Sequence, residues 1–161
     1  MPSWCLADRK RCVFVAIRRM EPEDFEKVLD MMLVFYASDA LLVHPDAHTL
    51  QRTLKAAIEA GPYLEGFVFT RTREIAGDGI IAKSYSTEMG GNCVWIEDIY
   101  VRPEFRKMGL CTDFLSFVEE QYREWAVRIR LEAENENQRA MRVYRNAGFE
   151  ELGYIQLVKT I

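Results

Sequence analysis

One stretch of the sequence, residues 94–111, combines a β-strand pattern, a basic turn and the start of a helix. Its first part is rich in β-branched and aromatic residues, and Pro103 ends that strand. From Gly109 onward, apolar residues recur with helical spacing. A helix N-terminus presents unpaired backbone N–H groups, and Arg106 and Lys107 add positive charge beside it. This stretch is therefore predicted to bind an oligoanion.

Residues 106–111, with the sequence Arg-Lys-Met-Gly-Leu-Cys, resemble the acetyl-CoA pyrophosphate loop of the GNAT superfamily of N-acetyltransferases. The pattern of that loop is Arg/Gln-x-x-Gly-x-Gly/Ala. Cys111 stands at the last position, where the family usually has Gly or Ala. Because Cys is small and its Cβ points back along the helix, we expect the backbone N–H to stay accessible to phosphate oxygens.

A second motif lies further along the chain, at residues 137–149. It resembles the Asn-x-x-Ala-x-x-x-Tyr-x-x-x-Gly-Phe helix of the same superfamily. The matching positions are Asn137, Ala140, Tyr144, Gly148 and Phe149. Two motifs in the expected order and spacing make the resemblance specific, and it extends from about residue 13 to residue 161.

The resemblance implies the GNAT fold, which is α/β, or α+β in some schemes. This fold has a mixed, mostly antiparallel sheet of six or seven strands with helices on both faces. Residues 1–12 are expected to form an N-terminal extension, and residues 13–161 a single N-acetyltransferase domain. A length of 161 residues fits one domain that can bury a sizeable core.

The activity implied is transfer of an acetyl group from acetyl-CoA, the co-substrate, to a primary amine of a small molecule or polypeptide. The amine would attack directly in a ternary complex. By resemblance, the backbone of residues 99–101 borders the pantetheine, and an N–H there polarises the thioester carbonyl. The residues expected to contact the co-substrate are Ile99, Tyr100, Val101, Arg106, Lys107, Met108, Gly109, Leu110, Cys111, Thr112, Asn137 and Tyr144.

Proton transfer needs an acceptor for the amine proton and a donor for the departing thiolate. Glu97 sits where diamine-acetyltransferase-like members have a Glu, so we expect it to be the base. Asp98 is the rival, since successive strand residues face opposite sides, and both could instead be ordinary polar positions. Tyr144 is the expected acid, because a phenol stays protonated at neutral pH. The alternative is that Tyr144 is a buried core residue.

The acceptor is the least determined part of the site. Tyr36 and Asp39, at the end of a predicted helix, lie where family members commonly contact the acceptor, although a purely structural role is the alternative. Asp98 is a third candidate for binding it. The run Ile-Glu-Asp-Ile-Tyr-Val and the excess of acidic residues favour a diamine or polyamine. The competing function is a non-catalytic CoA-binding sensor or interaction module on the same fold. A homodimer is allowed but not required by the sequence.

Periodicity and turn residues predict the elements that must position these residues. Acidic residues and a proline at positions 21–24 begin a helix, and a glycine and a proline at 61–62 end another. An antiparallel meander leads into the central strand, and a strand–helix–strand crossover follows it. The predicted strands are 14–18, 64–70, 75–86, 94–101, 128–133 and a closing strand at 154–159; the predicted helices are 21–36, 49–60, 110–125 and 138–147.

The composition excludes several other classes of protein. The net charge is −4 with both signs interspersed, which argues against binding nucleic acid. No apolar run could span a bilayer, and residues 1–12 lack the apolar core of a secretion signal. The cysteines at 5, 12, 93 and 111 show no paired spacing, so reduced thiols and a cytoplasmic location are predicted.

The spacing of His44 and His48 suggests a metal site, but the residues around them argue against one. The two residues are four apart with Asp46 between them, but Pro45 interrupts the helix that would place them on one face. No further His or Cys lies nearby in the sequence to complete a ligand set. We therefore predict a loop followed by a helix cap, and no metal.

Overall fold

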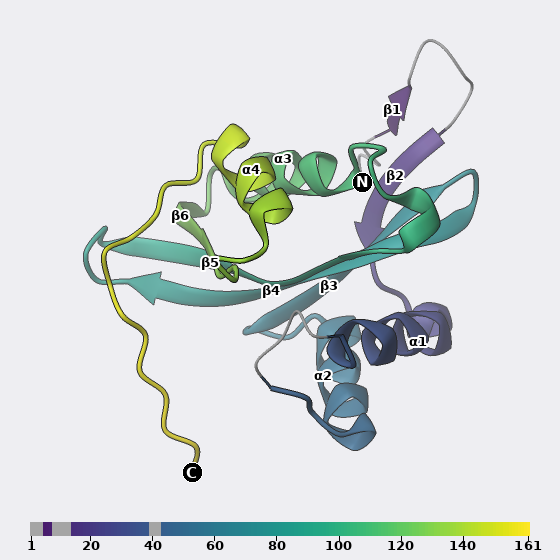
Figure 1. The fold of residues 1–161 in the computed structure, drawn as a ribbon, viewed down its shortest axis with the longest axis horizontal. Coiled ribbons are helices and arrows are strands. Elements are labelled where there is room, and N and C mark those ends of the chain that lie inside the picture. Colours follow the sequence, from purple (N-terminus) through teal and green to yellow (C-terminus); the bar gives the residue numbers. More distant parts are fainter. Residues whose placement is uncertain (1–4, 8–13, 39–42) are drawn as a thin grey trace.

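The computed structural model describes residues 5–7, 14–38 and 43–161. Its centre is a six-stranded sheet whose strands lie in chain order (Figure 1). Neighbouring strands from β1 to β5 are antiparallel, whereas β5 and β6 are parallel, as predicted for a mixed, mostly antiparallel sheet. The strands are β1 (Cys5–Ala7), β2 (Phe14–Arg19), β3 (Leu64–Arg71), β4 (Glu74–Ser86), β5 (Gly91–Val101) and β6 (Ala126–Leu131).

Helices cover both faces of the sheet, as the sequence predicted. Helices α1 (Phe25–Tyr36) and α2 (Ala47–Glu59) lie on one face, and α3 (Leu110–Tyr122) and α4 (Gln138–Asn146) on the other (Figure 1). Two short 3₁₀ helices, η1 (Pro22–Asp24) and η2 (Pro103–Phe105), follow β2 and β5. No helix within the described ranges is long and apolar enough to cross a membrane.

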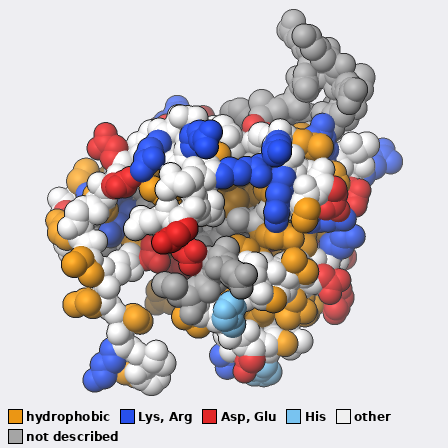
Figure 2. All heavy atoms as spheres, viewed as in Figure 1, with side chains coloured by type: hydrophobic (Ala, Val, Ile, Leu, Met, Phe, Trp, Pro, Cys, Tyr) orange, Lys and Arg blue, Asp and Glu red, His pale blue; other side chains and the backbone are white. Residues whose placement is uncertain are grey.

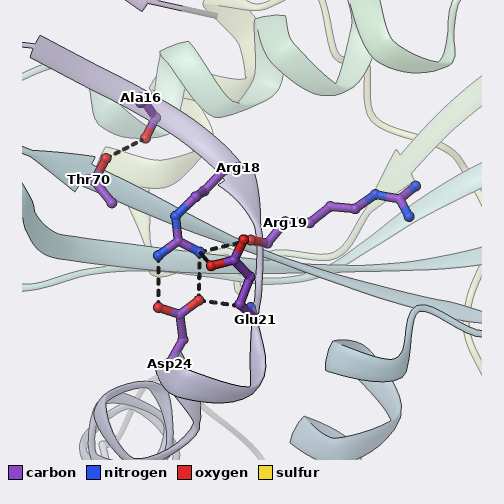
Figure 3. A network of polar contacts seen from close by, with 6 residues as sticks. All are labelled: Ala16, Arg18, Arg19, Glu21, Asp24 and Thr70. Atoms are coloured by element: carbon purple, nitrogen blue, oxygen red, sulfur yellow. Dashed lines mark hydrogen bonds and ion pairs between the residues drawn. The ribbon is translucent and has the colours of Figure 1, made fainter. Parts of the chain in front are cut away.

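A charged pair joins β2 to the start of α1. The Arg18 guanidinium donates to both carboxylate oxygens of Asp24, at 2.7 and 2.8 Å, and the backbone N–H of Glu21 donates to the same carboxylate (Figure 3). Burial opposes ionisation of Asp24, but these donors outweigh it and hold the pKa of Asp24 below its usual value. The interaction fixes the chain at the point where α1 begins.

Two apolar clusters, one on each face of the sheet, form the core. Helix α3 contributes Phe114 and Val118 to the first cluster, which includes Phe67 and Phe69 of β3. The second cluster lies under α1 and α2; its buried members are Met20, Val28, Leu29, Met31, Met32, Leu50, Leu54, Ala57, Val68, Ile80 and Tyr100. The buried apolar residues of these helices therefore face the sheet.

The prediction of a closing strand at 154–159 is wrong. The segment has no regular structure, and Ile155, Leu157 and Val158 are each more than 85% exposed. Its β-branched and aromatic composition favours a strand, but a strand also needs a partner edge, and the chain leaves the sheet here (Figure 1). The sixth strand is instead β1, which lies within the region expected to be an extension.

Close packing of α3 on the sheet depends on Gly79 of β4. A Cβ at this position would come within 2.5 Å of Cζ of Phe114, which is completely buried. We expect Gly79→Ala to lower the free energy of unfolding by about 1–3 kcal/mol, because an overpacked core must shift. Chemical denaturation measures this. Gly61→Ala is the control, since nothing lies within 4 Å of a Cβ there; equal stability of the two variants would contradict the packing described.

Candidate functional site

Strands β5 and β6 separate halfway along β5. They pair from Asn92 opposite Ala126 to Ile96 opposite Leu131, and there the pairing ends. Strand β5 continues to Val101 while staying paired with β4 on its other side. Among the described residues, the edge of β5 from 97 to 101 that faces away from β4 therefore has no partner strand. Apart from the carbonyl of Val101, which accepts a hydrogen bond from Nε of Arg106, the backbone groups of this edge can bind a ligand in the opening.

A β-bulge lies where this opening begins. Asp98 is opposite Ile80 and Ile96 is opposite Ile81, so Glu97 is the extra residue in β5. A bulge leaves one residue out of the regular alternation and turns the strand. Strict alternation predicts that Glu97 and Asp98 point to opposite faces of the sheet. The bulge breaks the alternation at this point, so that rule does not apply to the pair.

The two acids occupy different environments. Glu97 is exposed, whereas only 6% of Asp98 is exposed. Partial desolvation of its carboxyl group, and then the charges of Asp98 and Glu132, raise the pKa of Glu97 above its usual value. Of the two, Glu97 is the more accessible carboxylate to an incoming molecule.

Asp98 is held from the side of α1. The hydroxyl of Tyr36 donates to its carboxylate and lies 2.8 Å from Oδ1 and 2.9 Å from Oδ2. Burial raises the pKa of Asp98, and the Tyr36 hydrogen bond partly offsets this. Two predicted acceptor-binding residues are thus in direct contact; the third, Asp39, lies outside the described residues.

The predicted anion loop follows η2 and leads into α3. Lys107 (φ 65°) and Gly109 (φ 87°) both have left-handed backbone conformations, and Gly109 directly precedes the first residue of α3. No side chain caps this helix start. Residues 106–109 are exposed, and Nε of Arg106 donates to the carbonyl of Val101 at 2.9 Å. Unpaired N–H groups in such a concave turn suit an anion.

The residues at the start of α3, Leu110 to Thr112, differ in how accessible their side chains are to a ligand. Leu110 is buried in the core, so only its backbone can face a ligand. Thr112 is exposed, and Cys111 is half-buried. Burial raises the pKa of the Cys111 thiol to about 11, although the charge of Arg139 opposes this. The thiol is therefore neutral near pH 7, and the departure from the Gly/Ala pattern adds no negative charge to the loop.

Tyr144 lies on α4, close to the loop. Its ring packs edge-on against Phe149, with centroids 6.2 Å apart, and joins the same apolar cluster as Cys111, Ile99 and Val101. Burial, and then the neighbouring Cys111, raise the pKa of Tyr144 to about 12. The phenol is consequently protonated across the neutral pH range. It also lines, with Thr112, a groove of about 1180 Å³ between α3, β6 and α4.

Asn137 begins α4. Its side-chain oxygen accepts a hydrogen bond from the backbone N–H of Ala140 at 3.1 Å, so it is the helix N-cap. Asn135 and Gln138 lie beside it and are exposed. Capping uses the oxygen of the Asn137 amide, whereas its N–H₂ group donates to no partner among the described residues.

The two histidines lie in different surroundings. His44 lies in the loop before α2, with Nδ1 2.7 Å from the carbonyl oxygen of Tyr36, and His48 lies in the first turn of α2. Asp46 caps that helix by accepting from the N–H of Thr49. Within the described parts of the chain, no group of three His, Cys, Asp or Glu side chains is placed to hold a metal ion.

Charge is divided over the face that carries the opening. Figure 2 shows Lys and Arg side chains gathered in the upper part of this face and a group of Asp and Glu side chains near its middle. A cationic region next to an anionic one suits two ligands of opposite charge.

Comparison with known proteins identifies the family. The model of the acetyltransferase (GNAT) family matches residues 26–149. The chain belongs to this family. A bovine (Bos taurus) thialysine N-epsilon-acetyltransferase is 35% identical over 79 residues, which is 48% of this chain and 46% of the bovine protein. The chain thus matches about half the length of this curated relative.

Solved structures share the fold along most of the chain. A possible acetyltransferase from Clostridium difficile 630 superposes with a TM-score of 0.79 at 21% identity, covering 91% of this chain and 97% of its own. An aminoglycoside N-acetyltransferase in complex with CoA superposes with a TM-score of 0.77 at 18% identity, covering 93% and 97%. At these identities the likeness establishes the GNAT fold.

Two features of the site escaped prediction from the sequence. The bulge at Glu97 depends on the register between β4 and β5, and no residue in the run Ile-Glu-Asp-Ile marks it. Asp78, in β4, is 1% exposed and lies near Asp98. A Gly-Asp-Gly run inside an apolar strand was the available signal for this residue, and it reads equally well as a turn.

The geometry of the loop makes a prediction about CoA binding. Gly109→Glu should lower CoA affinity at least tenfold, because it places a carboxylate among N–H groups that bind an anion. Gly109 has φ 87°, so any side chain there also strains the backbone. Gly90→Glu is the matched control: it has φ 66°, open surroundings and a position in the β4–β5 turn. Calorimetric titration with CoA checks both variants, and equal affinities would place the phosphates elsewhere.

Proposed function

We propose that this protein is an N-acetyltransferase that transfers the acetyl group of acetyl-CoA to a primary amine of a small molecule or polypeptide. The proposal rests chiefly on one observation: the strands open beside an uncapped helix start, with an accessible carboxylate at the edge of the opening. Membership of the GNAT family supports it. The amine attacks the thioester directly, with both substrates bound at once.

The residues present fit acetyl-CoA. Left-handed backbone conformations at Lys107 and Gly109 suit a turn that binds pyrophosphate through backbone N–H groups, and Arg106 and Lys107 supply charge. The unpaired edge of residues 99–101 can hydrogen-bond the amide groups of the pantetheine arm. When bound, acetyl-CoA supplies an activated thioester. A backbone N–H of the same edge can stabilise negative charge on the carbonyl oxygen.

Glu97 serves as the base that accepts the amine proton, directly or through water. Its raised pKa brings it nearer to the pH at which an enzyme works, which favours general base catalysis. Asp98 is the poorer candidate, since it is buried and already accepts from Tyr36. We assign Asp98 and Tyr36 to positioning the acceptor amine.

Removal of the base has a pH-dependent consequence. Glu97→Gln should lower kcat/KM about 10²- to 10⁴-fold near pH 7 and less at high pH, where the amine is already unprotonated. In the wild type, activity should fall as the pH drops through the raised pKa of Glu97. Glu59→Gln removes an exposed acid at the end of α2, away from the opening, and is the control. An equal loss in both variants would indicate a general electrostatic effect instead of a base.

Tyr144 serves as the acid that protonates the departing thiolate. Tyr144→Phe keeps the ring packing against Phe149 and removes only the hydroxyl. We expect kcat to fall by about 10²-fold with little change in the KM for acetyl-CoA, since the lost interaction forms only in the transition state. Tyr85→Phe, at a tyrosine that is 63% exposed on β4, is the control. An unchanged kcat would leave Tyr144 a packing residue.

We further propose that the acceptor is a small amine that carries a second positive charge, such as a diamine, a polyamine or a lysine-like amino acid. Acidic side chains surround the opening, among them Glu97, Asp98 and Glu132. The similarity to an enzyme named for thialysine supports a compact amine of this kind. Turnover assayed against a panel of amines tests the proposal. Failure of every amine, with CoA still bound, would favour a non-catalytic CoA-binding module.

A further inference from the structure

A second acid lies beneath the acceptor side of the site. Asp78 is in β4, opposite Val68 of β3 and Tyr100 of β5, and its side chain is 1% exposed. In an antiparallel pair, a residue has one directly opposed partner on the neighbouring strand. The residues two positions before and after that partner are its diagonal neighbours on the same face of the sheet. Because Asp78 opposes Tyr100, Asp98 is its diagonal neighbour on the face covered by α1. The two carboxyl groups therefore share one apolar layer.

The surroundings of Asp78 cannot support a negative charge. Val68, Ile80 and Tyr100 are all buried members of the apolar cluster under α1 and α2. Oδ1 of Asp78 is buried and has no hydrogen-bond partner among the described residues. A buried, unpaired carboxylate is costly, and such a group takes up a proton instead.

Other titratable groups reinforce this conclusion. Those that face Asp78 are Asp98 and the phenol of Tyr100 from β5 and Tyr36 from α1, while β3 presents Val68. None of them is a cation that could balance a charged Asp78. Burial, and then the Asp98 charge, raise the pKa of Asp78 well above its usual value.

We propose that Asp78 is a neutral carboxylic acid in the resting protein and donates its hydrogen to the Asp98 carboxylate. Asp98 is then held from two sides, by the Tyr36 hydroxyl and by Asp78, and carries the single negative charge of the cluster. Asp78 is thus a positioning residue: it acts through Asp98, which faces the acceptor. This role rests on the function proposed above, whereas the protonation of Asp78 does not.

Two variants of similar side-chain shape test whether Asp78 acts as a neutral hydrogen-bond donor or as a charged carboxylate. Asn at position 78 keeps a hydrogen-bond donor but cannot ionise, and Leu keeps the shape without a donor. We expect Asp78→Asn to retain kcat/KM within about threefold and Asp78→Leu to lose about 10- to 100-fold, as for a lost hydrogen bond to a charged group. The loss should appear in the KM for the amine or in kcat, whereas the KM for acetyl-CoA should stay unchanged. Equal losses in both variants, or no loss in either, would overturn the proposal.

Stability against pH tests the protonation without any substrate. A raised pKa in the folded state means that the contribution of Asp78 to stability is complete below the pKa of the unfolded chain, about 4, and is lost as the pH rises. The folding equilibrium constant of the wild type should fall about tenfold per pH unit relative to Asp78→Asn, from pH 4 up to the folded pKa.

The expected result is a stability advantage of Asp78→Asn that grows between pH 4 and pH 7 in urea titrations. Parallel curves for the wild type and Asp78→Asn would show that Asp78 is ionised and would overturn the proposal. If the wild type turns over no amine at all, the proposed function fails, and the same curves still decide whether Asp78 is protonated.

Discussion

The candidate site depends on one feature of the sheet: β5 and β6 are no longer paired beyond Ile96 and Leu131. A strand in the middle of a sheet normally has both edges hydrogen-bonded, and an unpaired edge must find other partners. Here one edge of residues 97–101 is released while the other stays bound to β4. The strand therefore remains rigid, yet it presents a row of backbone donors and acceptors to a ligand.

The surrounding elements hold this opening in place. Phe114 of α3 sits where any side chain at Gly79 would stand, which brings the start of α3 close against the sheet. Helix α1 covers the opposite face and ends at Tyr36, whose hydroxyl reaches Asp98. The cationic loop and the acidic group are thus fixed to a common support, on opposite sides of one strand. This arrangement supports the proposed binding of two substrates of opposite charge.

Much of this arrangement could be predicted from the sequence, because it depends on local patterns. The strand that ends before Pro103 and the helices that begin after Gly109 and Asn137 are each encoded within a few residues. Register and solvent access are not local. The bulge at Glu97 and the burial of Asp78 follow from how β4 pairs with β5, and the segment 154–159 has strand composition but no strand partner. Prediction failed where the outcome depended on distant residues.

Hydrogen–deuterium exchange, measured with and without CoA, tests the central claim most directly, because it reports where the ligand binds and requires no acceptor. Binding in the opening should slow exchange in two separate segments, the free edge of residues 97–101 and the loop and helix start at 107–112. The β4–β5 turn around Gly90 should not change. Protection of only one of the two segments, or protection confined to another surface, would contradict the account of a ligand held between β5 and β6.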